Sequence, residues 1–277
     1  RWDLFTVRLD GTGWAKVCGP LLDGASAYAP AWSPTSERIA WTSDPSLSGH
    51  RGVYSNLAAG GDLRQVSGAV VAGGDVSGFL WAGDGARIAF RGDLHQDDVN
   101  ELFVADARGV GRLRVSGPMP VAGLLVVGDV YGFVWSPDGA FLAYTADQEA
   151  DEVVDLYVTD ALSPSAWQRV SGAHPATGDV KDWAWSPSSD RLLFRADFDV
   201  DEHPEAYTVA ASGGAPVKVS GPLGPDGHVY QAHWSLDGAR VVFGADLAGT
   251  NTFDLFSAPS TGGPRTNLSN LEAPGFV

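Results

Sequence analysis

The sequence predicts an all-β protein with a six-bladed β-propeller fold, of which this chain holds five complete four-stranded blades and half of a sixth. A tryptophan followed by a turn recurs at intervals of 49, 54, 50 and 49 residues, and a phrase resembling Val-Ser-Gly keeps the same interval. No segment shows sustained apolar residues at helical spacing. A period near fifty residues indicates a repeat architecture. The recurring tryptophans are Trp32, Trp81, Trp135, Trp185 and Trp234.

The repeat from 128 to 172 shows how one blade is built. It contains four runs rich in Val, Tyr, Phe, Trp and Thr, separated by Gly, Pro, Asp and Ser: GDVYGFVW, FLAYTAD, DLYVTDA and WQRVSG. This composition and spacing are typical of short strands. Pro137 and Gly139 suit a hairpin turn between the first two runs, because proline presets φ and glycine suits the exit. Four strands joined up and down form one propeller blade.

Two further residue types recur with the repeat. The tryptophans are expected to pack between neighbouring blades, since one indole buries roughly 200 Å². Arginines that follow the turns are expected to form structural pairs rather than to clamp a substrate. These arginines are Arg38, Arg87, Arg191 and Arg240.

The order WSPDG, apolar strand, acidic loop and DLYV strand, seen from Trp135 to Val158, resembles the TolB-type propeller repeat. Related turns after the other four tryptophans extend the resemblance over essentially the whole chain. The resemblance implies a six-bladed propeller and a protein exported from bacteria. It implies no single function, because the family includes protein-binding platforms, propeller domains of prolyl-oligopeptidase-like enzymes and polysaccharide lyases.

We expect one β-propeller domain over residues 1–277. The alignment of residues 3–7 with 155–159 predicts that residues 1–22 form the outer half of a split blade. One inner hairpin would then be absent from the chain. Either it belongs to a longer or trimmed parent chain, or a partner donates it by strand addition. The five blade repeats are expected at 23–70, 71–120, 121–174, 175–223 and 224–277.

Composition limits the partners. The net charge is −16 and the pI is near 4.5, which argues against direct binding to nucleic acid or to an anionic membrane surface. This charge favours cations or basic proteins as partners. The single cysteine, Cys18, excludes an internal disulfide framework. No apolar run approaches the length of a membrane-spanning helix.

Acidic loops follow the second strand of several repeats. Carboxylates at positions 1, 3, 5 and 9 of a loop are what a hard cation needs, because alternate oxygens turn inward, so we expect calcium sites. The alternative is that these loops are solvated turns. The pattern is eroded after Asp246 and lost after Asp44. The predicted ligands are Asp93, Asp97 and Glu101; Asp147, Glu149, Asp151 and Asp155; and Asp197, Asp199, Asp201 and Glu205.

A second acidic set precedes three of the tryptophans by six residues: Asp75, Asp129 and Asp179. In an up-and-down blade whose innermost strand comes first, this position lies near the mouth of the central channel. The acidic loops emerge on the same face, farther from the axis. The topology therefore predicts one strongly negative face.

No catalytic motif is evident. The sequence has neither a G-x-S-x-G nucleophile elbow nor an H-E-x-x-H motif. We therefore expect a non-enzymatic extracellular or periplasmic module that binds a protein partner or self-assembles, with calcium-stabilised acidic loops. One alternative is the propeller domain of an exported hydrolase or polysaccharide lyase whose catalytic part lies outside this chain. Another is a subunit of a homopolymer joined by strand complementation of the incomplete blade.

Overall fold

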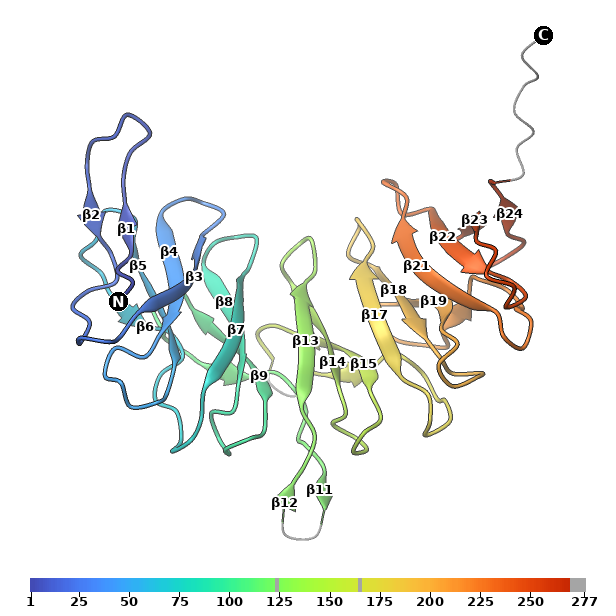
Figure 1. The fold of residues 1–277 in the computed structure, drawn as a ribbon, viewed down its shortest axis with the longest axis horizontal. Coiled ribbons are helices and arrows are strands. Elements are labelled where there is room, and N and C mark those ends of the chain that lie inside the picture. Colours follow the sequence, from blue (N-terminus) through green and yellow to red (C-terminus); the bar gives the residue numbers. More distant parts are fainter. Residues whose placement is uncertain (123–124, 164–165, 270–277) are drawn as a thin grey trace. The chain divides into compact units, whose positions relative to one another are not determined.

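The computed structural model describes residues 1–122, 125–163 and 166–269. Within these ranges every regular element is a strand, as the sequence predicts, and no helix could cross a membrane. The strands form five four-stranded sheets and two small two-stranded sheets (Figure 1). In each large sheet the strands follow one another in chain order, which is the topology expected of a blade.

The first strand of each large sheet is the one that ends in the recurring tryptophan. The sheets consist of β3 Ala27–Trp32, β4 Arg38–Ser43, β5 Gly52–Leu57 and β6 Arg64–Gln65; β7 Val76–Trp81, β8 Arg87–Gly92, β9 Glu101–Asp106 and β10 Leu113–Arg114; β13 Val130–Trp135, β14 Phe141–Ala146, β15 Asp155–Asp160 and β16 Gln168–Arg169; β17 Val180–Trp185, β18 Arg191–Ala196, β19 Glu205–Ala210 and β20 Val217–Lys218; and β21 His228–Trp234, β22 Arg240–Asp246, β23 Asp254–Pro259 and β24 Thr266–Asn267.

The described residues divide into two compact units. One contains Arg1–Trp135 with Gly139–Leu142 and Thr159–Trp167, and the other contains Ser136–Asp138, Ala143–Val158 and the chain from Gln168. Each unit has its own buried apolar clusters between adjacent sheets, around Phe90 and Phe103 in the first and around Phe194 and Phe243 in the second. The central strands carry these residues because both of their faces are covered.

The turns after the tryptophans take the geometry that the sequence predicts. In the turn from Ala82 to Gly85, the amide of Gly85 donates to the carbonyl of Ala82, and Gly85 has a φ of 67°. Gly139 has a φ of 72°. Ser36 and Ser189 occupy the same position with φ of 60° and 63° although they carry side chains. The turn geometry therefore persists where the glycine is lost.

The recurring tryptophans join successive sheets, and they do so by hydrogen bonds as well as by packing. The indole Nε1–H of Trp81 donates to the carbonyl of Ala31 at 3.1 Å, and that of Trp135 donates to Leu80 at 3.3 Å. In the second unit, Trp234 donates to Ala184 at 3.1 Å. Trp32 departs from the prediction of interblade packing, because it is 50% exposed.

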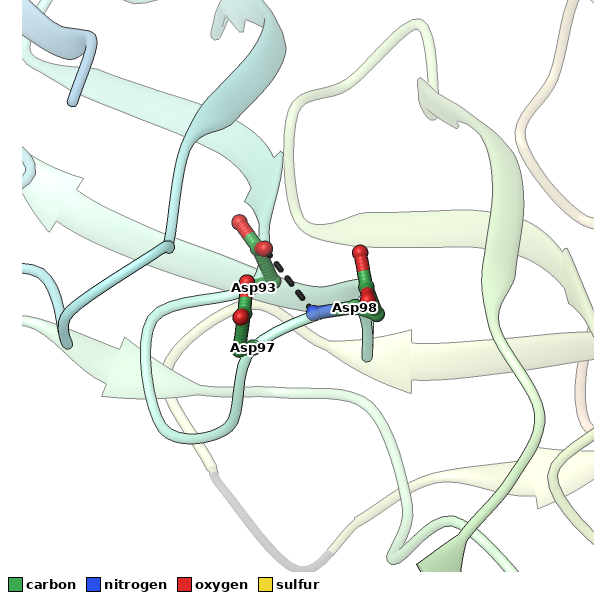
Figure 2. Close-up of side chains that lie close together, drawn as sticks. All are labelled: Asp93, Asp97 and Asp98. Carbon is green, nitrogen blue, oxygen red and sulfur yellow. Dashed lines mark hydrogen bonds between the residues drawn. The ribbon is translucent and has the colours of Figure 1, made fainter. Parts of the chain in front are cut away.

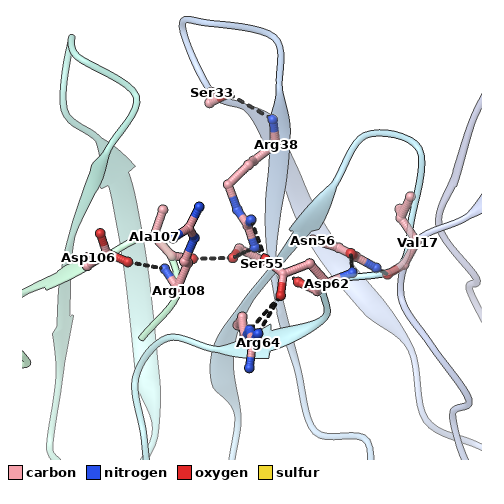
Figure 3. Close-up of polar contacts among 10 residues, drawn as sticks. All are labelled: Val17, Ser33, Arg38, Ser55, Asn56, Asp62, Arg64, Asp106, Ala107 and Arg108. Carbon is pink, nitrogen blue, oxygen red and sulfur yellow. Dashed lines mark hydrogen bonds and ion pairs between the residues drawn. The ribbon is translucent and has the colours of Figure 1, made fainter. Parts of the chain in front are cut away.

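The arginine on the second strand is a structural residue, as expected. Figure 3 shows Arg38, on β4, donating to the Asp62 carboxylate at 2.8 Å and to the Ser55 hydroxyl at 3.0 Å. Ser55 in turn donates to the carbonyl of Ala107, which follows β9. Arg38 is only 7% exposed. The buried guanidinium therefore joins residues of its own sheet, and Ser55 links that sheet to the next one.

Residues 1–22 form the short sheet expected of an outer half-blade. Strand β1 (Phe5–Thr6) pairs antiparallel with β2 (Ala15–Lys16). The amide of Ala27 donates to the carbonyl of Trp2 at 2.9 Å, just as the amide of Val76 donates to Arg51 at the next junction. The other short sheet is a hairpin of β11 (Val121–Ala122) and β12 (Leu125–Val126), which extends beyond β13 (Figure 1).

Candidate metal centre

The first carboxylate of each acidic loop closes the loop on itself. The Asp93 carboxylate accepts the amide of Asp98 at 3.1 Å, and the Asp197 carboxylate accepts that of Glu202 at 3.0 Å. The same contact, from an amide five residues later, occurs in all five blades, including the two in which the sequence pattern is eroded or lost. The remaining pairs are Asp44 with Gly49 at 2.7 Å, Asp147 with Glu152 at 3.2 Å and Asp246 with Asn251 at 2.5 Å.

The donor residue has a positive φ in every one of these loops, between 59° and 86°. A side chain rarely adopts this conformation, so the aspartate contact stabilises a strained backbone. The first aspartate is also buried in four of the five loops, with 8% exposure at Asp93, 2% at Asp147 and 1% at Asp197 and Asp246. This role was not predicted from the sequence, and it does not depend on a bound ion.

Three carboxylates gather in the Asp93 loop, between β8 and β9. Asp93, Asp97 and Asp98 each offer an oxygen within 4.8 Å of the others (Figure 2). Asp93 is buried, whereas Asp97 and Asp98 are exposed. Among the described residues none of the three forms an ion pair. Carboxylate oxygens held this close together form a set of ligands that suits a hard cation.

A glycine makes room for this cluster. A Cβ atom placed on Gly73 would clash with the carboxylate of Asp97. Gly73 also has a φ of 90°. A side chain at this position would therefore displace Asp97 and strain the backbone.

The Asp197 loop, between β18 and β19, brings the corresponding residues together. Asp197, Asp201 and Glu202 also offer oxygens within 4.8 Å of one another. Here the Nζ of Lys181 lies 3.0 Å from Asp197 and 3.9 Å from Glu202. Burial alone would raise the pKa of Asp197, but the amides of Asp179 and Glu202 and the Lys181 ammonium lower it below its ordinary value. The Lys181 ammonium thus offsets part of the negative charge of this cluster.

Several predicted ligands lie outside these clusters because they pair with bases. Glu101 contacts Arg114 at 2.6 Å and His95 at 2.7 Å. Glu205 contacts Lys218 at 2.5 Å, and the same ammonium contacts Asp199. The ninth-position carboxylate therefore belongs to an ion pair with the fourth strand in these blades.

The Asp147 loop, between β14 and β15, gathers no comparable cluster within the described part of the chain. Asp155 accepts a hydrogen bond from Ser171 and contacts His174 at 2.8 Å and Arg169 at 3.3 Å. Glu149 contacts the same guanidinium at 3.2 Å. Asp151 is exposed. Two of the four predicted ligands of this loop therefore have cationic partners from the chain itself.

The second acidic set forms links between blades. Asp75 accepts the amide of Arg51 at 2.5 Å, and Asp129 accepts that of Asn100 at 2.7 Å. In the second unit, Asp179 accepts the amide of Val154 at 2.9 Å. Each donor precedes the third strand of the preceding sheet. These aspartates therefore have a structural role that sequence reasoning missed.

Asp98 and Glu202 were missing from the predicted ligand sets, although both stand in the loops that were singled out. Their signal was the doubled acid at positions 5 and 6, Asp97-Asp98 and Asp201-Glu202. The position of Lys181 beside Asp197 was not predicted from the sequence. Chemically, the two clusters offer only oxygen ligands, which suit a hard cation such as calcium.

No family model and no curated protein matches the sequence. The structure is similar to prolyl oligopeptidase B from Galerina marginata, with a TM-score of 0.57 and 12% identity, over 88% of this chain and 37% of that enzyme. It is also similar to an oligogalacturonate lyase from Vibrio parahaemolyticus, with a TM-score of 0.51 and 12% identity, over 96% of this chain and 71% of the lyase. These two similarities show that the chain has a β-propeller fold.

Structures of TolB proteins are among the similar ones. The putative TolB from Agrobacterium tumefaciens has a TM-score of 0.47 and 18% identity, over 87% of this chain and 79% of that protein. The TolB of Acinetobacter baumannii has a TM-score of 0.44, and this chain spans 60% of its length.

Proposed function

We propose that this chain is a non-enzymatic propeller module that binds a protein partner or self-assembles, and that its Asp93 loop takes a calcium ion. The observation that carries the metal proposal is the gathering of Asp93, Asp97 and Asp98 within 4.8 Å, with no ion pair to any of them among the described residues. The three clustered side chains offer only carboxylate oxygens, which suit calcium better than zinc or copper.

The hydrogen bonds of Asp93 are compatible with this metal. One of its oxygens accepts the amide of Asp75 and the other accepts that of Asp98. A carboxylate oxygen can accept a second contact, so Asp93 can still face an ion. Asp97 and Asp98 would supply further oxygens, and main-chain carbonyls and water would complete the six to eight that calcium takes.

The binding role is supported by the chain's charge and by the absence of a catalytic motif from the sequence. A net charge of −16 favours a cationic partner and opposes association with nucleic acid. Calcium in the Asp93 loop would neutralise part of the local charge and hold Asp97 and Asp98 in one arrangement. The resemblance to the TolB-type repeat supports a location outside the cytoplasm, extracellular or periplasmic.

The alternative function is that of a propeller domain within a hydrolase. It is supported by the similarity to prolyl oligopeptidase B, of which this chain spans 37%. Hydrolysis of a peptide by a longer natural polypeptide that contains this chain would favour the alternative, whereas partner capture without turnover would favour the binding module.

Thermal unfolding with calcium, with magnesium and with chelator, at fixed ionic strength, tests the metal proposal. Free calcium at about 100 times the dissociation constant should stabilise the protein by about 2.7 kcal/mol. Asp97→Asn should abolish this gain. Asp151→Asn is the matched control, since Asp151 is an exposed loop acid outside both clusters, and it should keep the gain. An equal response to calcium in both variants would refute the assignment to the Asp93 loop.

A further inference from the structure

The loops at Asp93 and Asp197 share one backbone arrangement, but the first strands beside them carry different residues at the second position. In both, the first aspartate accepts the amide of the aspartate that precedes that strand, Asp75 in one case and Asp179 in the other. Both first strands also have a register shift at the same place, after Val76 and after Val180. Two residues after the preceding aspartate, one blade has Ser77 and the other has Lys181.

The Lys181 ammonium lies at the centre of the carboxylates around the Asp197 loop. Its Nζ is 3.0 Å from Asp197, 3.5 Å from Asp179 and 3.9 Å from Glu202. The Asp197 side chain is fully buried, and that of Lys181 is 29% exposed. A buried carboxylate is costly unless a cation neutralises it. In the Asp197 loop, the positive charge of Lys181 therefore lies directly beside the first aspartate.

The serine of the other blade cannot supply that charge. The Ser77 hydroxyl accepts a hydrogen bond from Arg91 at 2.8 Å and lies 3.2 Å from the Arg91 carbonyl, to which it donates. Arg91 itself donates to the carbonyls of Val130 and Tyr131. Its guanidinium forms no ion pair with Asp93, Asp97 or Asp98 in the described chain.

We infer that Lys181 is a tethered cation that takes the place of a free metal ion in the Asp197 loop, and that the residue at this position decides which of these two loops needs metal. The Asp197 loop, where the Lys181 ammonium contacts the first aspartate, is the independent evidence that this backbone arrangement receives a cation. The inference deepens the proposed function and rests on it for the Asp93 loop, where Ser77 leaves the cation to come from solution. The ligand class is a hard divalent cation, with calcium as the probe.

Calorimetric titration of the whole chain with calcium tests the inference through a reciprocal pair of variants. Lys181→Ser should bind one more calcium ion than the wild type, and Lys181→Arg should not, because the guanidinium keeps the charge. Ser77→Lys should weaken calcium binding at the Asp93 loop by roughly tenfold or more, which corresponds to about 1.4 kcal/mol. It should also raise the melting temperature measured in chelator.

The outcomes separate this inference from the proposed function. If the wild type binds no calcium but Lys181→Ser does, the assignment to the Asp93 loop fails and the role of Lys181 stands. If Lys181→Ser folds and binds no more calcium than the wild type, the inference is overturned. Should Lys181→Ser fail to fold, Ser77→Lys decides: a lower melting temperature in chelator than the wild type would overturn the inference, and a higher one would support it.

Discussion

Replacing Asp197 with asparagine should strongly destabilise the second unit. The side chain is buried, and its two oxygens accept the amide of Asp179 at 2.6 Å and that of Glu202 at 3.0 Å. Asp197→Asn keeps the shape but turns one acceptor into an NH₂ group, which leaves one amide without its acceptor and removes the charge beside Lys181. A lost charge-assisted hydrogen bond costs about 1.5–3 kcal/mol. We therefore expect the free energy of unfolding to fall by about 1.5–3 kcal/mol.

Urea unfolding followed by tryptophan fluorescence measures this loss, and amide hydrogen exchange locates it. The amides of Asp179 and Glu202 should lose protection in Asp197→Asn. The matched control is Asp201→Asn, an exposed carboxylate of the same loop, for which we expect a change within about 0.5 kcal/mol. A cost below about 1 kcal/mol for Asp197→Asn, or one equal to that of the control, would refute the loop-closing role.

Two further predictions concern contacts elsewhere in the fold. Trp135→Phe should lower the free energy of unfolding by about 1 kcal/mol, because the hydrogen bond to the Leu80 carbonyl is lost. Trp32→Phe should leave the free energy of unfolding nearly unchanged, since Trp32 is half exposed. Equal losses in the two variants, measured by urea unfolding, would contradict this prediction. Burial alone would lower the pKa of His174, but the Asp155 carboxylate and the Pro175 carbonyl raise it overall. The stabilisation is therefore complete below about pH 6.5 and is lost as the pH rises through the folded-state pKa. The difference in free energy of unfolding between the wild type and His174→Gln should therefore become smaller as the pH rises above about 6.5. A difference that does not change with pH would contradict the proposed contribution of the His174–Asp155 contact.

The repeat pattern predicted the fold well because it is a local signal. Strand lengths, turn residues and the position of each tryptophan are visible within ten residues of sequence, and the sheets formed where the runs were expected. The odd residue was Trp32. The sequence around Trp32 resembles that around the other tryptophans. The exposure of its indole depends on which segments pack against it, and a local sequence pattern does not show this.

The ligand sets were predicted less well because carboxylates at alternate positions do not show which of them has a base nearby. A sequence signal for these bases was nevertheless present farther along each repeat. A base stands directly before the Val-Ser-Gly phrase in the three middle blades, as with Glu101 and Arg114 or Glu205 and Lys218, whereas the last blade pairs Asp254 with Asn267. The first blade has Gly52 and Gln65 at these two positions, so acid and base are lost together.

The most direct test of the calcium assignment is a crystal structure of the chain grown with calcium. The account predicts one ion bound by Asp93, Asp97 and Asp98, with oxygens at roughly 2.3–2.6 Å, and none at Asp197, where the Lys181 ammonium remains in place. An Asp93 loop without an ion at saturating calcium would contradict the account. An ion that displaces Lys181 would contradict it as well.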